Sequence, residues 1–205
     1  MLTRKSPRPM TAAALMLGII TLSGYSQDGS EAPDAGNTGE VSTANNEMLE
    51  KAMQGEALAQ YTLGVMYDRG LSVMQNYREA VRWYRAAAEQ GHTTAQFSLG
   101  VMYAAGEGVA RDYQEAVRWF RVLAEKGHGH AQNNLGDMYY KGQGISQDYV
   151  LAHLWFNLAA SNITDDYKEM AVKNRDMVAE KMTSEQIAEA VILALQWDLK
   201  RQGSQ

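Results

Sequence analysis

Three copies of one segment follow each other without gaps at a spacing of 36 residues, and this spacing limits the folds open to the chain. The copies span residues 59–94, 95–130 and 131–162, and they begin AQYTLGVMY, AQFSLGVMY and AQNNLGDMY. A fixed period of this length is typical of stacked helix pairs, in which each unit buries its apolar face against its neighbours. We therefore predict an all-α solenoid of antiparallel helix pairs.

The first half of each copy has the apolar pattern of a helix. Positions 1, 5, 8, 9 and 12 fall within one stripe at 100° per residue, and in the first copy they are Ala59, Leu63, Met66, Tyr67 and Gly70. A glycine lies beside this stripe in every copy, as Gly64, Gly100 and Gly136. Glycine inside a helix costs ~1 kcal/mol relative to alanine. Its recurrence predicts that a neighbouring helix backbone or a tryptophan ring lies directly against it.

The second half of each copy predicts another helix, with large rings set against alanines. Its inward face in the first copy is Ala80, Trp83, Tyr84, Ala87 and Ala88. Asn76 and Asp112 each precede a glutamate by three residues, which predicts N-caps closed into capping boxes by Glu79 and Glu115. Asp148 predicts a cap without the box, because Leu151 follows it.

The turn between the two helices contains two glycines in the second and third copies. These turns read GEGV at 106–109 and GQGI at 142–145, which suits a tight turn that requires positive φ. The first copy reads GLSV and has Ser72 at the second glycine position. We therefore predict a different or slightly strained turn at Ser72.

Taken together, the pattern A-x-x-x-L-G-x-x-Y-x-x-G-x-G-V-x-x-D-x-x-x-A-x-x-W-Y-x-x-A-A-x-x-G resembles the Sel1-like repeat, a relative of the tetratricopeptide repeat. The resemblance implies a right-handed superhelix that serves mostly as an adaptor or scaffold. It also implies an exported bacterial protein that takes part in envelope assembly, signalling or host contact. Some cysteine-rich Sel1-repeat proteins are described as β-lactamases or penicillin binders. This chain has no cysteine and no recognisable S-x-x-K motif, so we do not transfer that activity.

Both ends of the array predict capping segments, because a solenoid must cover the apolar faces of its last regular units. Residues 47–58 predict an N-terminal capping helix. Residues 163–200 predict two C-terminal capping helices, the first capped by Thr164 and the second by Thr183 together with Gln186.

The N-terminal residues predict export. Residues 1–26 combine a basic start, the apolar run 12–22 and small residues, as in a cleavable signal peptide. No cysteine follows the run, so we expect no lipid anchor and no stable membrane insertion after signal removal. Residues 27–46 are polar and predict a disordered linker. The predicted location is periplasmic or secreted.

Candidate binding residues lie opposite the apolar stripe of the first helices, toward the predicted concave face. They are Tyr61, Val65, Asp68, Phe97, Val101, Ala104, Asn133, Asp137 and Tyr140. Tyr61 and Phe97 in one exposed row would form an apolar strip that receives a peptide or a helix of a protein partner. The other interpretation, ordinary solvated surface, remains equally open.

Other chemistry has little support in the sequence. The chain carries 24 acidic and 19 basic residues, which argues against nucleic-acid binding. Because Gly-His at 91–92 recurs at 127–128, we interpret His92 and His128 as parts of a turn and expect no metal or other cofactor. His153 is interpreted as a surface variant. Catalytic motifs are absent, so we predict a non-enzymatic adaptor; the alternative is a cell-wall-related enzyme or a glycan or β-lactam binder.

Overall fold

The computed structural model describes residues 38–203, with side chains from residue 45 onward except Gln202. The predicted signal peptide at 1–26 and the first part of the predicted linker lie outside the described residues. Within this range the chain forms nine helices and no strand. They are α2 (Thr38–Met53), α3 (Ala57–Arg69), α4 (Tyr77–Glu89), α5 (Thr93–Ala105), α6 (Tyr113–Glu125), α7 (Gly129–Lys141), α8 (Tyr149–Asn162), α9 (Lys168–Ala179) and α10 (Ser184–Gln202).

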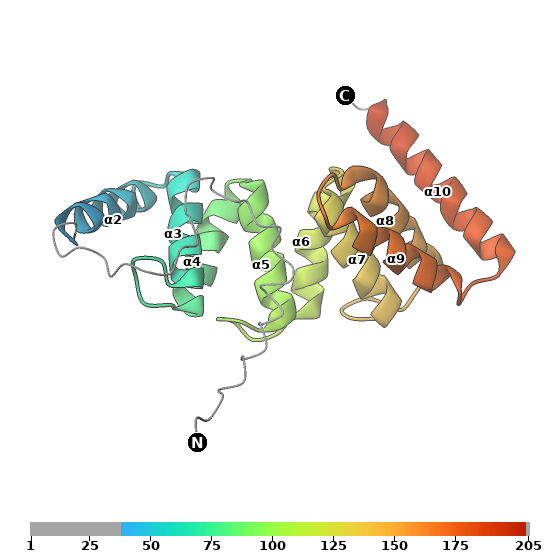
Figure 1. Ribbon diagram of the computed structural model, residues 1–205, viewed down its shortest axis with the longest axis horizontal. Coiled ribbons are helices and arrows are strands. Elements are labelled where there is room, and N and C mark those ends of the chain that lie inside the picture. Colours follow the sequence, from blue (N-terminus) through green and yellow to red (C-terminus); the bar gives the residue numbers. More distant parts are fainter. Residues whose placement is uncertain (1–37, 204–205) are drawn as a thin grey trace, which may run out of the picture.

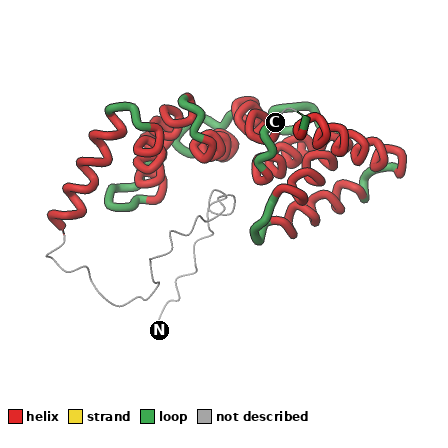
Figure 2. Tube along the Cα trace, turned by 90° about the horizontal axis from the view of Figure 1, so that it is seen from above, coloured by secondary structure: helices red, strands yellow, loops and turns green. Residues whose placement is uncertain are grey.

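The helices follow one another along a single elongated row, which Figure 1 shows from the side. Seen from above, the row bends into an arc (Figure 2). Consecutive helices pack as the pairs α3 with α4, α5 with α6 and α7 with α8, and each pair contacts the next. The predicted all-α solenoid of antiparallel pairs is confirmed.

Helix α2 extends further toward the N-terminus than the sequence predicted. It begins at Thr38 and ends at Met53, so the last part of the predicted linker 27–46 is helical, and the predicted cap 47–58 divides between α2 and α3. Ala52 at the end of α2 is buried with Ala59 and Leu63 of α3. Once packing fixes the last turn of α2, adding helical residues before it costs little free energy. The polar composition of those residues does not reveal this effect.

The aromatic residue after each tryptophan lies against the recurring glycine. A Cβ added to Gly64, Gly100 or Gly136 would lie 2.6, 2.8 or 2.9 Å from the ring of Tyr84, Phe120 or Phe156, respectively. The prediction of a helix backbone or a tryptophan ring at this contact is therefore wrong, because the ring of the next residue, tyrosine or phenylalanine, lies there. The tryptophans make other contacts: Trp83 packs with Ala52 of α2 and Leu63 of α3, and Trp155 meets Trp197 of α10.

Helix capping follows the sequence in part. Asn76, Asp112 and Asp148 accept hydrogen bonds from backbone N–H groups at the starts of α4, α6 and α8. Glu79 and Glu115 face Arg82 and Arg118 in ion pairs one helical turn on, so we correct their predicted role in capping boxes.

The two C-terminal helices begin differently. Thr183 and Gln186 form the predicted capping box of α10. Thr164 caps no helix, because α9 begins at Lys168 behind the N-cap Tyr167. Asp165 instead holds the turn before α9, where its side chain accepts a hydrogen bond from the Tyr167 N–H at 3.0 Å.

The inter-helix turns pack against the preceding unit. A Cβ on Gly108 would lie 2.1 Å from the Tyr77 carbonyl oxygen, and one on Gly144 would lie 2.3 Å from the Tyr113 carbonyl group. Both glycines have positive φ, and so does Ser72 at 58°, the only such non-glycine residue in the described part of the chain. The predicted strain at Ser72 is confirmed. The Ser72 side chain is exposed, and the Asn45 side chain of α2 donates a hydrogen bond to its carbonyl oxygen at 3.5 Å.

Candidate functional site

Three residues of the predicted concave face are buried. Phe97, Val101 and Asn133 are only 5%, 4% and 7% exposed, which corrects their assignment as binding residues. The Phe97 ring lies between those of Phe120 and His128, at centroid distances of 5.8 and 5.3 Å. Helix α5 is therefore enclosed by its neighbours on the side opposite its apolar stripe as well.

Asn133 is covered for a different reason. The side chain of Asn174 on α9 donates a hydrogen bond to the Asn133 side chain at 3.0 Å. Helix α9, which packs mainly against α8, thus also reaches α7, whose residues from Gly129 to Gly136 are nearly all buried. A single copy of the repeat contains no sign of this covering helix.

The other predicted residues remain partly accessible, and we call them the first-helix surface. They are Tyr61, Val65 and Asp68 of α3, Ala104 of α5, and Asp137 and Tyr140 of α7. Several are held in place by contacts: Asp137 forms an ion pair with Lys141 at 2.8 Å, and the Tyr140 ring lies 5.8 Å from that of Tyr149. The surface presents two tyrosines and two carboxyl groups on a rigid frame.

Tyr61 is the aromatic residue of the first-helix surface that is held by two ring contacts. Its ring stacks on the His92 ring at a centroid distance of 4.6 Å and tilts against Tyr84 at 5.8 Å. Burial raises the pKa of the Tyr61 hydroxyl above its usual value, so this group stays protonated at neutral pH. A fixed, neutral phenol of this kind can offer apolar area and one hydrogen bond to a partner.

Two carboxyl groups lie near each other at the Asp68 end of the first-helix surface. The Tyr84 hydroxyl donates a hydrogen bond to Asp68 at 3.2 Å, yet burial raises the pKa of the Asp68 carboxyl. Glu107, on the turn between α5 and α6, also has a raised pKa, first through burial and then through the charge of Asp68. The Oε2 atom of Glu107 is buried without a hydrogen-bond partner. This end of the first-helix surface is therefore electronegative.

His92 and His128 cap the first helices of the second and third units. The Nδ1 atoms accept hydrogen bonds from the N–H groups of Ala95 and Ala131, both at 3.2 Å. This confirms the interpretation of the recurring Gly-His as part of the turn. Among the described residues, no cluster of three or more histidine and carboxylate side chains is arranged to hold a metal ion.

Acid is expected to weaken both caps, because Nδ1 can accept a hydrogen bond only while it is unprotonated. Burial lowers the pKa of His92 and His128, with the charge of His130 adding to the effect at His128. The unfolded chain therefore takes up protons first, and stability falls as the pH drops below about 6.5. We expect a loss of about 1 kcal/mol per cap, measured by urea unfolding at several pH values.

The matched variant replaces both residues with asparagine, which can cap a helix but does not titrate. His92→Asn/His128→Asn is expected to flatten the decrease in stability between neutral pH and about pH 5. Part of the decrease remains, since burial also lowers the pKa of His153. The raised pKa values of Asp68 and Glu107 act in the opposite sense and are common to both proteins. Identical pH profiles for both proteins would contradict the capping role.

Two further histidines are engaged in the structure. His130 Nε2 lies 3.0 Å from Asp165 Oδ2, and its ring meets Tyr167 edge-on. His153 is only 4% exposed, so its interpretation as a surface variant is wrong. It occupies the same repeat position as Val81 and Val117, both of which are also buried. The substitution of valine by a polar residue concealed the burial of this position.

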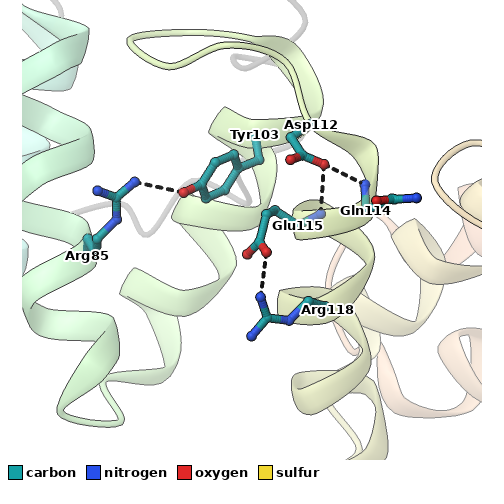
Figure 3. A network of polar contacts seen from close by, with 6 residues as sticks. All are labelled: Arg85, Tyr103, Asp112, Gln114, Glu115 and Arg118. Carbon is teal, nitrogen blue, oxygen red and sulfur yellow. Dashed lines mark hydrogen bonds and ion pairs between the residues drawn. The ribbon is translucent and has the colours of Figure 1, made fainter.

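Side-chain hydrogen bonds between neighbouring units were not predicted from the sequence. Figure 3 shows Arg85 of α4 donating to the Tyr103 hydroxyl of the next unit at 2.7 Å, beside the capping network of Asp112. Arg121 and Tyr139 repeat this contact one period later at 3.4 Å. The recurrence of arginine and tyrosine at these positions was the available signal.

A second recurring bond lies inside the array. The amide groups of Gln60, Gln96 and Gln132 donate to the carbonyl oxygens of Ala52, Ala88 and Ala124 at 3.0–3.1 Å. Each of these bonds links the first helix of a unit to the end of the preceding helix. These buried donor groups fix the register between successive helices.

One open pocket of about 430 Å³ lies where α10 crosses the third unit. Its lining residues are Glu125, Trp155, Trp197, Lys200 and Arg201. The two tryptophan rings meet at 72° with centroids 5.8 Å apart. Because the pocket depends on the path of α10, the repeat pattern alone could not reveal it.

Comparison with protein families accounts for this architecture. The family model described as "Sel1 repeat" matches residues 57–92, 93–128 and 129–162, which together make up more than half of the chain. The chain belongs to the Sel1 repeat family. Each matched Sel1 unit starts at the first residue of α3, α5 or α7, two residues before the boundary that we chose from the sequence. Sel1 repeat proteins are generally scaffolds for protein interactions.

Two solved structures resemble this Sel1 repeat protein. One is c5321, described as a protective antigen present in uropathogenic Escherichia coli strains and displaying an SLR fold; it is 38% identical with a TM-score of 0.68. The match covers 76% of this chain but only 32% of c5321. The other is a Sel1 repeat protein from Oxalobacter formigenes, 38% identical with a TM-score of 0.54, over 62% of this chain and 96% of that one.

Two further findings complete the comparison. No curated protein matches the chain. Among the described residues, no helix is both long and apolar enough to span a membrane.

Proposed function

We propose that this chain is a non-enzymatic adaptor of the bacterial envelope that binds a protein partner through the first-helix surface. The observation that carries the proposal is the rigid, partly exposed set of Tyr61, Asp68, Asp137 and Tyr140 on a Sel1 scaffold. Export is supported by the signal-like residues 1–26, and the similarity to an E. coli antigen agrees with it.

The geometry of the tyrosines supports a binding role. Tyr61 is held between His92 and Tyr84, and Tyr140 lies against Tyr149, so neither ring must be ordered when a partner arrives. Aromatic side chains ordered before binding are typical of residues that dominate an interface. Asp68, with Glu107 near it, adds negative charge to the same surface, whereas the charge of Asp137 is balanced by Lys141. This favours a partner segment with lysine or arginine next to apolar residues.

Replacing Tyr61 and Tyr140 by alanine is expected to weaken partner binding about tenfold or more, because each truncation removes a fixed aromatic contact. Partners are first captured by crosslinking in the native envelope and identified by mass spectrometry. Affinity of the purified partner is then measured for each variant. Val122→Ala is the matched control, since Val122 is 41% exposed on a second helix. Phe97→Ala is unsuitable, because the Phe97 ring belongs to the core.

Two outcomes would contradict this function. Unchanged affinity of both tyrosine variants for every identified partner would exclude the first-helix surface as the binding site. Hydrolysis of nitrocefin by the purified protein would instead support the alternative of an enzyme that acts on β-lactams.

A further inference from the structure

The outer face of α10 carries an apolar stripe in the position where a solenoid normally has a polar cap. Four large residues of α10 are exposed, namely Val191 at 39%, Ile192 at 54%, Leu195 at 60% and Leu199 at 69%. The opposite face of the helix is buried, through Ala190 and Ala194, and Trp197 packs against Trp155. Helix α10 thus closes the third unit and presents a second apolar face outward.

The spacing of this stripe is that of a helix seam. Ala188, Ile192, Leu195 and Leu199 succeed one another at intervals of four, three and four residues. Alternating intervals of three and four are the pattern by which two helices interlock side chains along a shared line. The seam covers most of α10, which contains 19 residues.

We propose that the α10 seam pairs with α10 of a second copy of this chain, in antiparallel orientation, to form a symmetric dimer. The seam has the same spacing when read in reverse, so each copy meets its partner with an identical pattern. Reversal places the small Ala188 opposite the large Leu199, and Ile192 opposite Leu195. A two-fold pairing of this kind is closed and leaves no further seam exposed.

The charges of α10 favour the same orientation. Glu185 and Glu189 lie in its first two turns, and Lys200 lies in its last turn. Arg201 is engaged on the inner side of α10, where it pairs with Asp198 and lies over the Trp197 ring. Antiparallel pairing brings the acidic start of one helix near the basic end of the other, whereas parallel pairing would place like charges together. The opposed helix dipoles add to this preference.

A single helix pair buries less surface than the ~1,600 Å² of a standard stable interface. The dimer is therefore expected to depend on concentration. Sedimentation velocity of the full chain from ~1 μM to ~1 mM should show a monomer that converts to a dimer. Leu195→Glu should remove the dimer over this range, because it would bury a charge in the seam.

Met74→Glu is the matched control. Met74 is 90% exposed on the turn after α3, remote in the sequence from α10, so its replacement should leave the dimer intact. Circular dichroism establishes that both variants remain folded, and Ile192→Gln repeats the seam test with an uncharged side chain. A monomer throughout the range, an unaffected Leu195→Glu dimer, or loss of the dimer in Met74→Glu would each overturn the proposal.

Orientation can be tested because the natural sequence has no cysteine. Ala188→Cys and Leu199→Cys are made separately and treated with a short thiol crosslinker. Antiparallel pairing predicts linkage only when the two variants are mixed, since identical positions lie ~16 Å apart along the axis. Linkage within each variant alone, or no linkage in the mixture, would overturn the antiparallel seam.

Discussion

Gly108→Ser is expected to lower the free energy of unfolding by about 3 kcal/mol or more. Serine at φ 71° resists the left-handed conformation. Its Cβ would also lie 2.1 Å from the Tyr77 carbonyl oxygen, and backbone cannot move aside as a side chain can. The second unit would have to separate from the start of α4. Chemical denaturation of the purified protein measures the loss.

The chain contains its own control for this prediction. Ser72 occupies the same repeat position in the first unit, where its φ is 58°. Ser72→Gly relieves that strain but increases the freedom of the unfolded chain, so stability should change by less than about 1 kcal/mol. Equal effects of the two substitutions would show that contact with the preceding unit does not determine the need for glycine.

Gly100→Ala is expected to destabilise the protein by about 1–3 kcal/mol, the cost of inserting a methyl group into a packed core. The direction of this change is informative, because a glycine-to-alanine substitution in an exposed helix stabilises the protein by about 1 kcal/mol. The added Cβ would lie 2.8 Å from the Phe120 ring, which is only 1% exposed and belongs to the packed core. Thermal or urea unfolding measures the change.

A double-mutant comparison isolates this contact. Phe120→Leu alone should destabilise by leaving space, and Gly100→Ala should then cost less in the Phe120→Leu background than in the natural chain. Simple additivity of the two changes would exclude a direct conflict between the methyl group and the ring. A stabilising effect of Gly100→Ala alone would also contradict the packing described above.

The repeat pattern predicted the features that every unit shares. Trp83, Tyr84 and their counterparts are inward because their spacing defines a helix face, and Asn76, Asp112 and Asp148 cap helices because side-chain oxygens satisfy free N–H groups. The requirement for glycine beside a ring was also visible. The sequence did not reveal which ring lies there, because the tryptophan and the aromatic residue after it are adjacent and differ only in the direction of their side chains.

The candidate site was harder to predict, because exposure depends on neighbours outside the unit. Phe97 was expected to face solvent from its position opposite the stripe, yet the ring of His128, the N-cap residue of α7, covers it. Asn133 is covered by α9, and the buried His153 occupies a position that is valine elsewhere. A helical wheel places residues around one helix and contains no information about the helices that surround it.

The hydrogen bonds of Arg85 to Tyr103 and of Arg121 to Tyr139 join each unit to the next at the tips of long side chains. Because such a hydrogen bond lies far from the contact between the two helix axes, it limits how far neighbouring units can tilt relative to each other. The bend of the whole arc is then a sum of local angles, each adjustable by a single side chain. Replacing one of these side chains with a shorter one would change the distance between the two ends of the protein while every helix remained intact.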